Sequence, residues 1–517
     1  MDITRRAAKV DDITLLILFF CVLKLAIHFV SLGEYGFHAD ELYYIELGKN
    51  FEWGFPDISP FVSWIATLSE FCFGSSTIAF RIVPCVFSAL SVMLTGYITH
   101  YLGGGKLAII IACSSMICSP AYLATSYLLQ PVVFDVFFWT LLTFSIVAYQ
   151  KTKLQKYLFL AAIAMGLGML NKYSIFLYFA LLSVAALITD FSNLTGVIKR
   201  LILPSLLFLL LIAPNVIWQI SHGLPAFHYV YSVGSSKFSI DIADYLFQLF
   251  FFHGAGVAVW SAGFLFMIFN QKTKERGLLW CISFLSLILI LALLKGKLYY
   301  GLGIFPILFA AGGQCWEILL NRLKVPMRIV FLGMLYLFAL LSLPVVIPVL
   351  PVGLCKIYIQ HMVKYTTFSR PLRYEDGREG DIPQFFADMR EWENFVGKVS
   401  RLSAHLSEKS GTTNILTEDY AIAGALKYYG SESMAKVISA HNSLLLYSPD
   451  SLHAETVLYL TKTSMDTVKQ FGVQVLLVDH FKTENSHLDG LNIYRITRPK
   501  VLMRRKYLSD IQNFYPH

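Results

Sequence analysis

Charged residues are scarce in this chain. Of its 517 residues, 15% are Asp, Glu, Lys or Arg and 56% are hydrophobic, whereas soluble domains carry about 25% charged residues. The shortage is concentrated in the first 350 residues, where apolar runs recur. These runs reach the roughly 20 residues that a helix needs to cross a bilayer core. The composition therefore excludes an ordinary soluble protein and predicts a polytopic α-helical membrane protein.

Paired cysteines are also missing. None of the eight cysteines forms a C-x-x-C pair, and none lies beyond Cys355. The C-terminal part therefore has neither a disulfide framework nor a thiolate metal site. The sequence also has no internal repeat and no low-complexity segment.

The net charge of +8 does not indicate a nucleic-acid partner. The basic residues stand in short clusters between apolar runs, which is the pattern of membrane topology signals and not of a basic binding face. The first apolar run, residues 13–32, follows one such cluster. It ends in Gly-Glu-Tyr-Gly-Phe-His and not in small residues, so we interpret it as a retained helix and not as a cleaved signal peptide.

Eleven membrane spans are expected. They lie near residues 12–32, 77–101, 107–125, 130–149, 157–171, 174–190, 200–220, 244–269, 278–294, 299–315 and 329–352. The shorter amphipathic segment 60–73 is expected to lie at the membrane interface.

The loops between these spans alternate in basic content. The richer set carries Arg5, Arg6 and Lys9; Lys106; Lys151, Lys153 and Lys156; Lys199 and Arg200; Lys272, Lys274 and Arg276; Arg322, Lys324 and Arg328. The poorer set carries Lys49, Arg81, Lys172, Lys237, Lys295 and Lys297. Because Lys and Arg are enriched in cytoplasmic loops, the richer set is predicted to be cytoplasmic. An odd number of spans then places the C-terminus outside the cytoplasm.

Two domains are expected. Residues 1–353 form a membrane domain with a long first outer loop, 33–76, and residues 354–517 form a small α/β domain. In the second domain, helical periodicity is expected at 384–406, 420–429 and 464–471, and short β-rich runs stand at 413–417, 436–440, 456–461 and 473–479. Such alternation is typical of a small α/β fold.

The outer ends of several spans carry polar residues. The first outer loop begins with the acidic pair Asp40 and Glu41, followed by Tyr43 and Tyr44. Taken alone, a carboxylate in a loop is most often solvated and without function. Asp135, in contrast, lies within a predicted span, where an ionisable group is costly and is by default a functional candidate.

Cations stand near the same predicted outer ends. These are Arg81, Lys172, Lys295 and Lys297, with Tyr299 and Tyr300 next to the last pair. Each lysine alone is most simply an interfacial anchor. Cations and tyrosine hydroxyls together suit a phosphate, and a nearby carboxylate suits general-base activation of a hydroxyl. A lipid-linked phosphate at the membrane surface meets both conditions.

Several runs along the chain carry a further signal in their order and spacing. They begin with GFHADELYY in the first outer loop and continue with FDVFFWTLLTF, GLGMLNKYSIFL, APNVIWQISHGLPAF and KGKLYYGLGIFPILFAAGG. They reach the C-terminal domain in ILTEDYAIAGALKYYG and ISAHN. Together these runs resemble bacterial glycosyltransferase family 39, the protein mannosyltransferase-like and aminoarabinose transferase-like group of the GT-C superfamily. This resemblance implies a GT-C fold and transfer of a sugar from a polyprenyl-phosphate carrier to an acceptor hydroxyl.

The resemblance also implies roles for individual residues. Asp40 matches the catalytic carboxylate, with Glu41 beside it, and Asp135 matches an acidic position at the outer end of a span. Tyr43, Tyr44, Lys172 and either Tyr299 or Tyr300 match positions that contact the carrier phosphate or face the cavity. Asp57 matches an acidic position before a Pro-Pro pair, but Ser59-Pro60 stands here, and Tyr43 replaces a common arginine.

The expected mechanism is an inverting displacement, with Asp40 as base and a polyprenyl phosphate as leaving group. The expected partners are that donor, membrane lipids, and a glycolipid such as lipid A, a polysaccharide or a protein as acceptor, in a bacterial inner membrane. No cofactor is required, and a divalent metal stays open. His222 is expected to line the active-site cavity. The spacing of the histidines His222, His228 and His253, which His38 and Asp57 could join, matches no closed zinc pattern.

Two other functions remain as alternatives. A transporter is disfavoured because no internal repeat is visible and the polar residues cluster at one face and not at the centre, although Lys24 and His28 lie in the first span. A non-catalytic assembly protein is disfavoured by the intact Asp40, Asp135 and Lys172.

Overall fold

The computed structural model describes residues 3–189, 194–234, 242–270, 274–294, 296–409 and 412–514. The chain divides into two compact units. The helical unit comprises residues 1–32, 78–217 and 234–349, and the mixed unit comprises residues 33–77, 218–233 and 350–517. The first outer loop therefore belongs to the same compact unit as the C-terminal sheet.

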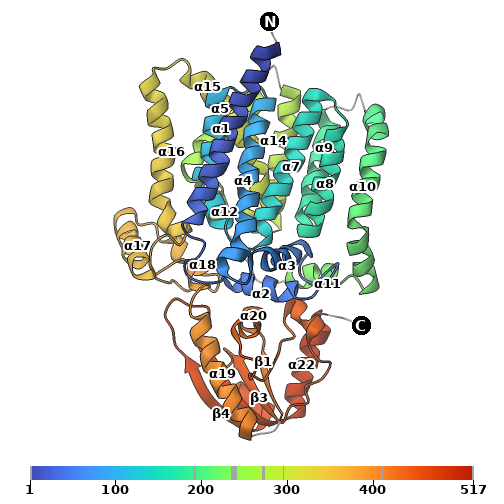
Figure 1. Ribbon diagram of the computed structural model, residues 1–517, viewed down its shortest axis with the longest axis vertical. Coiled ribbons are helices and arrows are strands. Elements are labelled where there is room, and N and C mark those ends of the chain that lie inside the picture. Colours follow the sequence, from blue (N-terminus) through green and yellow to red (C-terminus); the bar gives the residue numbers. More distant parts are fainter. Residues whose placement is uncertain are drawn as a thin grey trace. The chain divides into compact units, whose positions relative to one another are not determined.

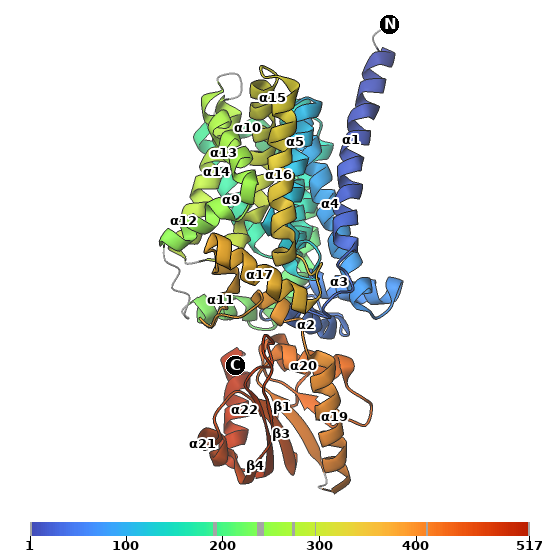
Figure 2. The same cartoon turned by 90° about the vertical axis from the view of Figure 1, so that its left-hand side faces the viewer.

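Helices make up the helical unit, and the longer ones run alongside one another in both views (Figures 1 and 2). They are α1 (Ile3–Phe29), α4 (Thr77–Tyr101), α5 (Lys106–Cys118), α6 (Pro120–Thr125), α7 (Pro131–Thr152), α8 (Lys156–Asn171), α9 (Ser174–Thr189), α10 (Leu194–Ser221), α12 (Ile242–Phe251), η1 (Gly254–Gly256), α13 (Val257–Phe269), α14 (Lys274–Leu293), η2 (Leu298–Ile304), α15 (Phe305–Leu320) and α16 (Val325–Val346).

Among the described residues, six helices are long and apolar enough to cross a membrane. The number rises to seven if the bent pair Tyr245–Phe251 and Gly254–Phe269 counts as one span. Shorter apolar helices coincide with the remaining predicted spans at 107–125, 157–171, 174–190 and 278–294. The chain is a multi-pass membrane protein, as the composition predicts, and the count of eleven spans stays a prediction.

Two of the predicted spans are not single straight helices. The span expected at 107–125 is divided into α5 and α6 at Ser119, whose backbone is extended. Pro120 follows at the first position of α6, and the residue before a proline is driven out of the helical region by steric clash. The span expected at 244–269 bends by 93° near η1.

The sheet of the mixed unit has five strands: β1 (Thr413–Thr417), β2 (Lys436–Ile438), β3 (Thr456–Thr461), β4 (Gly472–Phe481) and β5 (Leu491–Pro499). Their order is β2-β1-β3-β5-β4. β2, β1 and β3 are parallel, and β5 and β4 are antiparallel to their neighbours. The predicted small α/β fold is confirmed, with four strands where they were expected and β5 added.

The mixed unit also contains helices. They are α2 (Ala39–Gly48), α3 (Phe61–Phe73), α11 (Pro225–Gly234), α17 (Val352–Thr366), η3 (Arg370–Leu372), α18 (Gln384–Ala387), α19 (Trp392–Lys409), α20 (Tyr420–Tyr429), η4 (Asn442–Tyr447), α21 (Met465–Val468), η5 (Lys469–Phe471) and α22 (Val501–Phe514). In both views, α19 and α22 lie on opposite sides of the sheet (Figures 1 and 2).

A small hydrophobic cluster joins the first outer loop to the C-terminal region. Its buried members are Tyr43, Leu47, Phe55, Ala423 and Leu444. Burying apolar surface of this kind contributes roughly 25 cal/mol per Å². The helix that carries Asp40 is thus packed on the C-terminal region and is not a free loop.

Candidate active site

The start of α2 holds the acidic pair in two different environments. His38 caps the helix, and its Nδ1 accepts a hydrogen bond of 3.1 Å from the backbone N–H of Asp40. Glu41 is fully buried, and its carboxylate accepts a hydrogen bond of 2.9 Å from the backbone N–H of His38. This reciprocal arrangement is a capping box. Glu41 thus serves the helix end, whereas the Asp40 side chain is about 30% exposed.

The carboxylate of Asp40 contacts a residue from the far end of the sequence. The hydroxyl of Tyr420, the first residue of α20, donates a hydrogen bond of 2.7 Å to Asp40 Oδ1. The charge of Asp40, together with burial, raises the pKa of Tyr420 well above its ordinary value. The hydroxyl therefore keeps its proton and acts as a donor.

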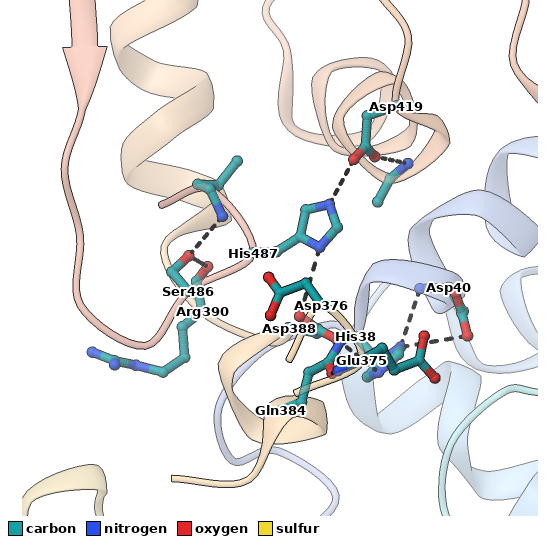
Figure 3. A network of polar contacts seen from close by, with 12 residues as sticks. His38, Asp40, Glu375, Asp376, Gln384, Asp388, Arg390, Asp419, Ser486 and His487 are labelled. Atoms are coloured by element: carbon teal, nitrogen blue, oxygen red, sulfur yellow. Dashed lines mark hydrogen bonds and ion pairs between the residues drawn. The ribbon is translucent and has the colours of Figure 1, made fainter. Parts of the chain in front are cut away.

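A chain of polar contacts connects the caps of α2 and α20 (Figure 3). Asp419 caps α20 and accepts from the backbone N–H groups of Ala421 and Ile422. His487, in the β4–β5 loop, bonds Asp419 at 2.7 Å and lies 3.6 Å from Asp388. Asp388 in turn lies 3.9 Å from the ring of His38.

Charge stabilises this chain of contacts. Burial opposes the positive charge of His487, but Asp419 and Asp388 outweigh it and raise the pKa of His487 to about 10. Burial also opposes the charge of Asp419, but His487 and the N–H of Ile422 hold the pKa of that carboxyl well below its usual range. At neutral pH, a charged imidazolium therefore stands between two carboxylates.

Tyr43 and Asp57 form a second cluster in the mixed unit. The Tyr43 hydroxyl donates to Asp57 at 2.8 Å and accepts from the backbone N–H of Ser443 at 3.0 Å. The hydroxyl of Ser443 also bonds Asp57. Burial raises the pKa of Asp57, and these hydrogen bonds oppose that shift. Burial and the nearby carboxylate raise the pKa of Tyr43 well above its ordinary value.

The helical unit brings together other predicted residues. Asp135, in the second turn of α7, is 5% exposed and accepts a hydrogen bond of 3.0 Å from the Ser174 hydroxyl. Lys172 follows α8 and lies within electrostatic range of that carboxylate. Its ammonium also lies 4.0 Å from the centre of the Tyr300 ring, a cation–π distance.

The neighbouring segment contributes a second lysine. Lys297 Nζ lies 5.9 Å from the centre of the Tyr299 ring, and Lys172 Nζ lies 5.8 Å from the same ring. The two lysines therefore flank one aromatic side chain. Lys295 lies outside the described residues.

Two other cations of the helical unit are fully buried. Arg81 donates a hydrogen bond of 3.0 Å to the carbonyl of Leu32 and lies over the Tyr127 ring. Lys24 donates a hydrogen bond of 3.2 Å to the carbonyl of Tyr122. The Lys24 contact ties α1 to α6, which gives Lys24 a structural role.

The predicted histidines each have their own local surroundings. His253 is buried against Ser119 at 2.8 Å, whereas His222 stacks on Trp218 and contacts its carbonyl at 2.8 Å. His228 is exposed. Within the part of the chain that the structure describes, no group of three or more His, Cys, Asp or Glu side chains is arranged to hold a metal ion.

Comparison with known proteins identifies the fold. Residues 57–218 match the family described as dolichyl-phosphate-mannose-protein mannosyltransferase. The crystal structure of ArnT from Cupriavidus metallidurans bound to undecaprenyl phosphate superposes with a TM-score of 0.62 at 13% identity, over 93% of this chain and 97% of that one. The chain therefore has the fold of ArnT. No curated protein sequence matches it.

Two further structures share this GT-C fold. ArnT from C. metallidurans in the apo state superposes with a TM-score of 0.61 at 12% identity, over 93% of this chain and 97% of that one. The archaeal oligosaccharyltransferase AglB from Archaeoglobus fulgidus, solved with an inhibitory peptide and a dolichol-phosphate, gives 0.51 at 12% identity, over 96% of this chain and 77% of that one. The expected GT-C resemblance is thus confirmed at the level of the fold.

Sequence reasoning did not single out some residues at this candidate site. Tyr420, Asp388 and His487 surround the start of α2 but lie about 350 to 450 positions along the chain from it. The only signal was the run ILTEDYAIAGALKYYG, which contains Asp419 and Tyr420 and was noted for its resemblance alone.

Proposed function

We propose that this protein transfers a sugar from a polyprenyl-phosphate carrier to an acceptor hydroxyl outside the cytoplasm, with inversion at the anomeric carbon. The main support for this proposal is the position of Asp40. Its carboxylate is partly exposed at a helix start, and it lies in a sequence run that resembles family 39. Residues 57–218 match a family whose description names a sugar donor linked to a lipid phosphate. The compared ArnT and AglB structures contain undecaprenyl phosphate and dolichol-phosphate.

Asp40 acts as the general base. As the acceptor oxygen attacks the anomeric carbon, its proton passes to the Asp40 carboxylate and the bond from that carbon to the phosphate oxygen breaks. The leaving group is polyprenyl phosphate, which is stable as an anion and needs no general acid. One carboxylate is therefore sufficient, in contrast to the paired carboxylates of most glycosidases.

Lys172 stabilises the negative charge that develops on the leaving phosphate, with Lys297 and the hydroxyls of Tyr299 and Tyr300 as further donors. A preorganised charge of this kind lowers the transition state more than the ground state. Asp135 and Ser174 position this group of residues. Glu41 holds the start of α2, since its carboxylate is used in the capping box.

The acceptor is a hydroxyl of a glycolipid such as lipid A, of a polysaccharide or of a protein. The proposed location is the bacterial inner membrane, with the α/β region in the periplasm. A divalent metal is not assigned a role.

The test is mass spectrometry of membrane glycolipids and glycoproteins from cells that lack the gene. These cells are complemented with wild-type protein, Asp40→Asn or Glu41→Gln. The wild-type protein should add a sugar mass to one membrane component. Asp40→Asn should lower that product at least about 10²-fold, the scale of general-base catalysis.

Glu41→Gln is the matched control, because glutamine also completes a capping box and we expect a much smaller loss. Immunoblots of the membranes check that each variant accumulates. A normal level of product with Asp40→Asn would refute the assignment of the base, and Asp135→Asn would then be tested.

A further inference from the structure

Helix α20 of the C-terminal region lies directly against α2. Three of its positions, one turn apart, face α2: Tyr420 bonds Asp40 at 2.7 Å, Gly424 lies at the backbone of Leu42, and Lys427 pairs with Glu46 at 3.0 Å. Residues at spacings of three and four share one face of a helix. One face of α20 therefore packs against the helix that carries the proposed base.

Gly424 allows this close approach. A Cβ atom at this position would lie 2.7 Å from the carbonyl oxygen of Leu42, closer than van der Waals contact. The two backbones therefore meet without an intervening side chain, and Tyr420 reaches Asp40 from a fixed position.

The two helix starts are also joined through their caps. Asp419 caps α20, His38 caps α2, and the chain Asp419–His487–Asp388–His38 runs between them (Figure 3). The backbone adds a further tie, because the N–H of Ala39 donates to the carbonyl of Asp388 at 3.0 Å. Tyr420 and Asp40 each lie within two positions of these caps, so their relative position is set by several independent contacts.

We infer that Tyr420 is a positioning residue for Asp40, and that the C-terminal region therefore completes the catalytic centre. The phenol donates its proton to Oδ1 and fixes the rotation of the carboxylate. Oδ2 is then held in one direction toward the acceptor hydroxyl. This inference rests on the proposed function of Asp40 and adds a residue from a different part of the chain.

The principal variant is Tyr420→Phe, which removes only the hydroxyl that bonds Asp40. We expect the transfer rate in membranes to fall about tenfold or more, the effect of losing one hydrogen bond to a charged group. Binding of undecaprenyl phosphate to the purified protein, followed by native mass spectrometry, should stay unchanged. Loss of phosphate binding in parallel with the rate would overturn the inference, because it would indicate a general structural defect.

Tyr428→Phe is the matched control. Tyr428 is on the same helix, and its hydroxyl also makes one hydrogen bond, of 3.0 Å to the hydroxyl of Ser75. Because that partner is not the proposed base, we expect the transfer rate of Tyr428→Phe to stay within about twofold of wild type. An equal loss in the two variants would contradict a specific role for Tyr420.

A double-mutant cycle separates positioning from folding. If Tyr420 acts through Asp40, adding Tyr420→Phe to Asp40→Asn should cause little further loss of rate, since coupled residues are not additive. If the two losses multiply, Tyr420 acts elsewhere and the inference fails. The cycle is repeated with Tyr420→Leu, so that a folding defect peculiar to one replacement does not decide the result.

The outcomes for the two proposals differ. If Asp40→Asn transfers sugar normally, the proposed function of Asp40 fails, whatever Tyr420 does. If Asp40→Asn is inactive and Tyr420→Phe is normal, only the inference about Tyr420 fails.

Discussion

At the scale of single residues, chemical type and local position supplied the candidates. Asp135 was singled out because an ionisable group at membrane depth is costly, and Lys172 because a cation at an outer turn suits a phosphate; the structure brings them together with Ser174 and Tyr300. Glu41 stood beside Asp40 as a catalytic candidate. Only the structure of α2 distinguishes their roles, because the Glu41 carboxylate accepts a hydrogen bond from the backbone N–H of His38 at the helix start.

Lys172→Ala tests the phosphate role. Loss of one preorganised charge typically costs about 2–4 kcal/mol in the transition state, so transfer at limiting donor should fall roughly 30- to 1,000-fold. Titration of the purified variant with undecaprenyl phosphate should show weaker binding. The measurement is the initial rate of sugar transfer over a range of donor concentrations.

Lys153→Ala is the control for this change. Lys153 also lies over a tyrosine ring, at 5.7 Å from that of Tyr149, at the other end of α7. It should leave transfer and phosphate binding unchanged. Equal rates for Lys172→Ala and wild type would show that Lys172 is an interfacial anchor.

At the scale of elements, periodicity located most helices and strands but did not reveal their partners. The runs at 413–417 and 456–461 coincide with β1 and β3, and 420–429 coincides with α20. β5 was not predicted, although it lies between β3 and β4 in the sheet. Its sequence, LNIYRITRP, carries charged and polar residues within the strand, which weakens the alternation on which a strand prediction depends.

The contact between α2 and α20 is tested by Gly424→Ala. The added Cβ would lie 2.7 Å from a carbonyl oxygen of α2, and overpacking of this kind typically costs about 1–3 kcal/mol. We expect a lower thermal unfolding midpoint of the purified protein and a lower transfer rate. Fluorescence-detected thermal unfolding in detergent measures the first effect.

Gly397→Ala serves as the comparison. Gly397 is in α19, where an added Cβ would meet nothing within 4 Å. Alanine in a helix interior is favoured over glycine by about 1 kcal/mol, so this variant should be as stable as wild type or slightly more so. A Gly424→Ala protein as stable as Gly397→Ala would mean that the helices are not closely packed.

At the scale of the whole molecule, the proposed reaction requires one orientation in the membrane. A reporter fused after His517 should be extracytoplasmic, and one fused after Lys274 should be cytoplasmic, because Lys and Arg are concentrated in one set of loops. Alkaline phosphatase and green fluorescent protein fusions give opposite signals on the two sides. A cytoplasmic C-terminus would place the α/β region on the wrong side for the proposed reaction.

The sequence by itself determined the class of protein. Scarce charge and recurrent apolar runs require a lipid environment for most of the helices, since hydrophobicity depends on composition and spacing alone. Alternating helical and β-rich runs likewise predicted the α/β region. These properties are local, and each is contained in a window of about 20 residues or fewer.

The tertiary structure decided which distant groups meet. Asp40 and Tyr420 are 380 positions apart in the chain, and no local pattern relates them. Their contact depends on a glycine that permits two backbones to approach and on a charged histidine between two caps. The proposed base could be named from the sequence because the run GFHADELYY resembles family 39. The residue that positions it could not, because positioning is a property of the packed fold.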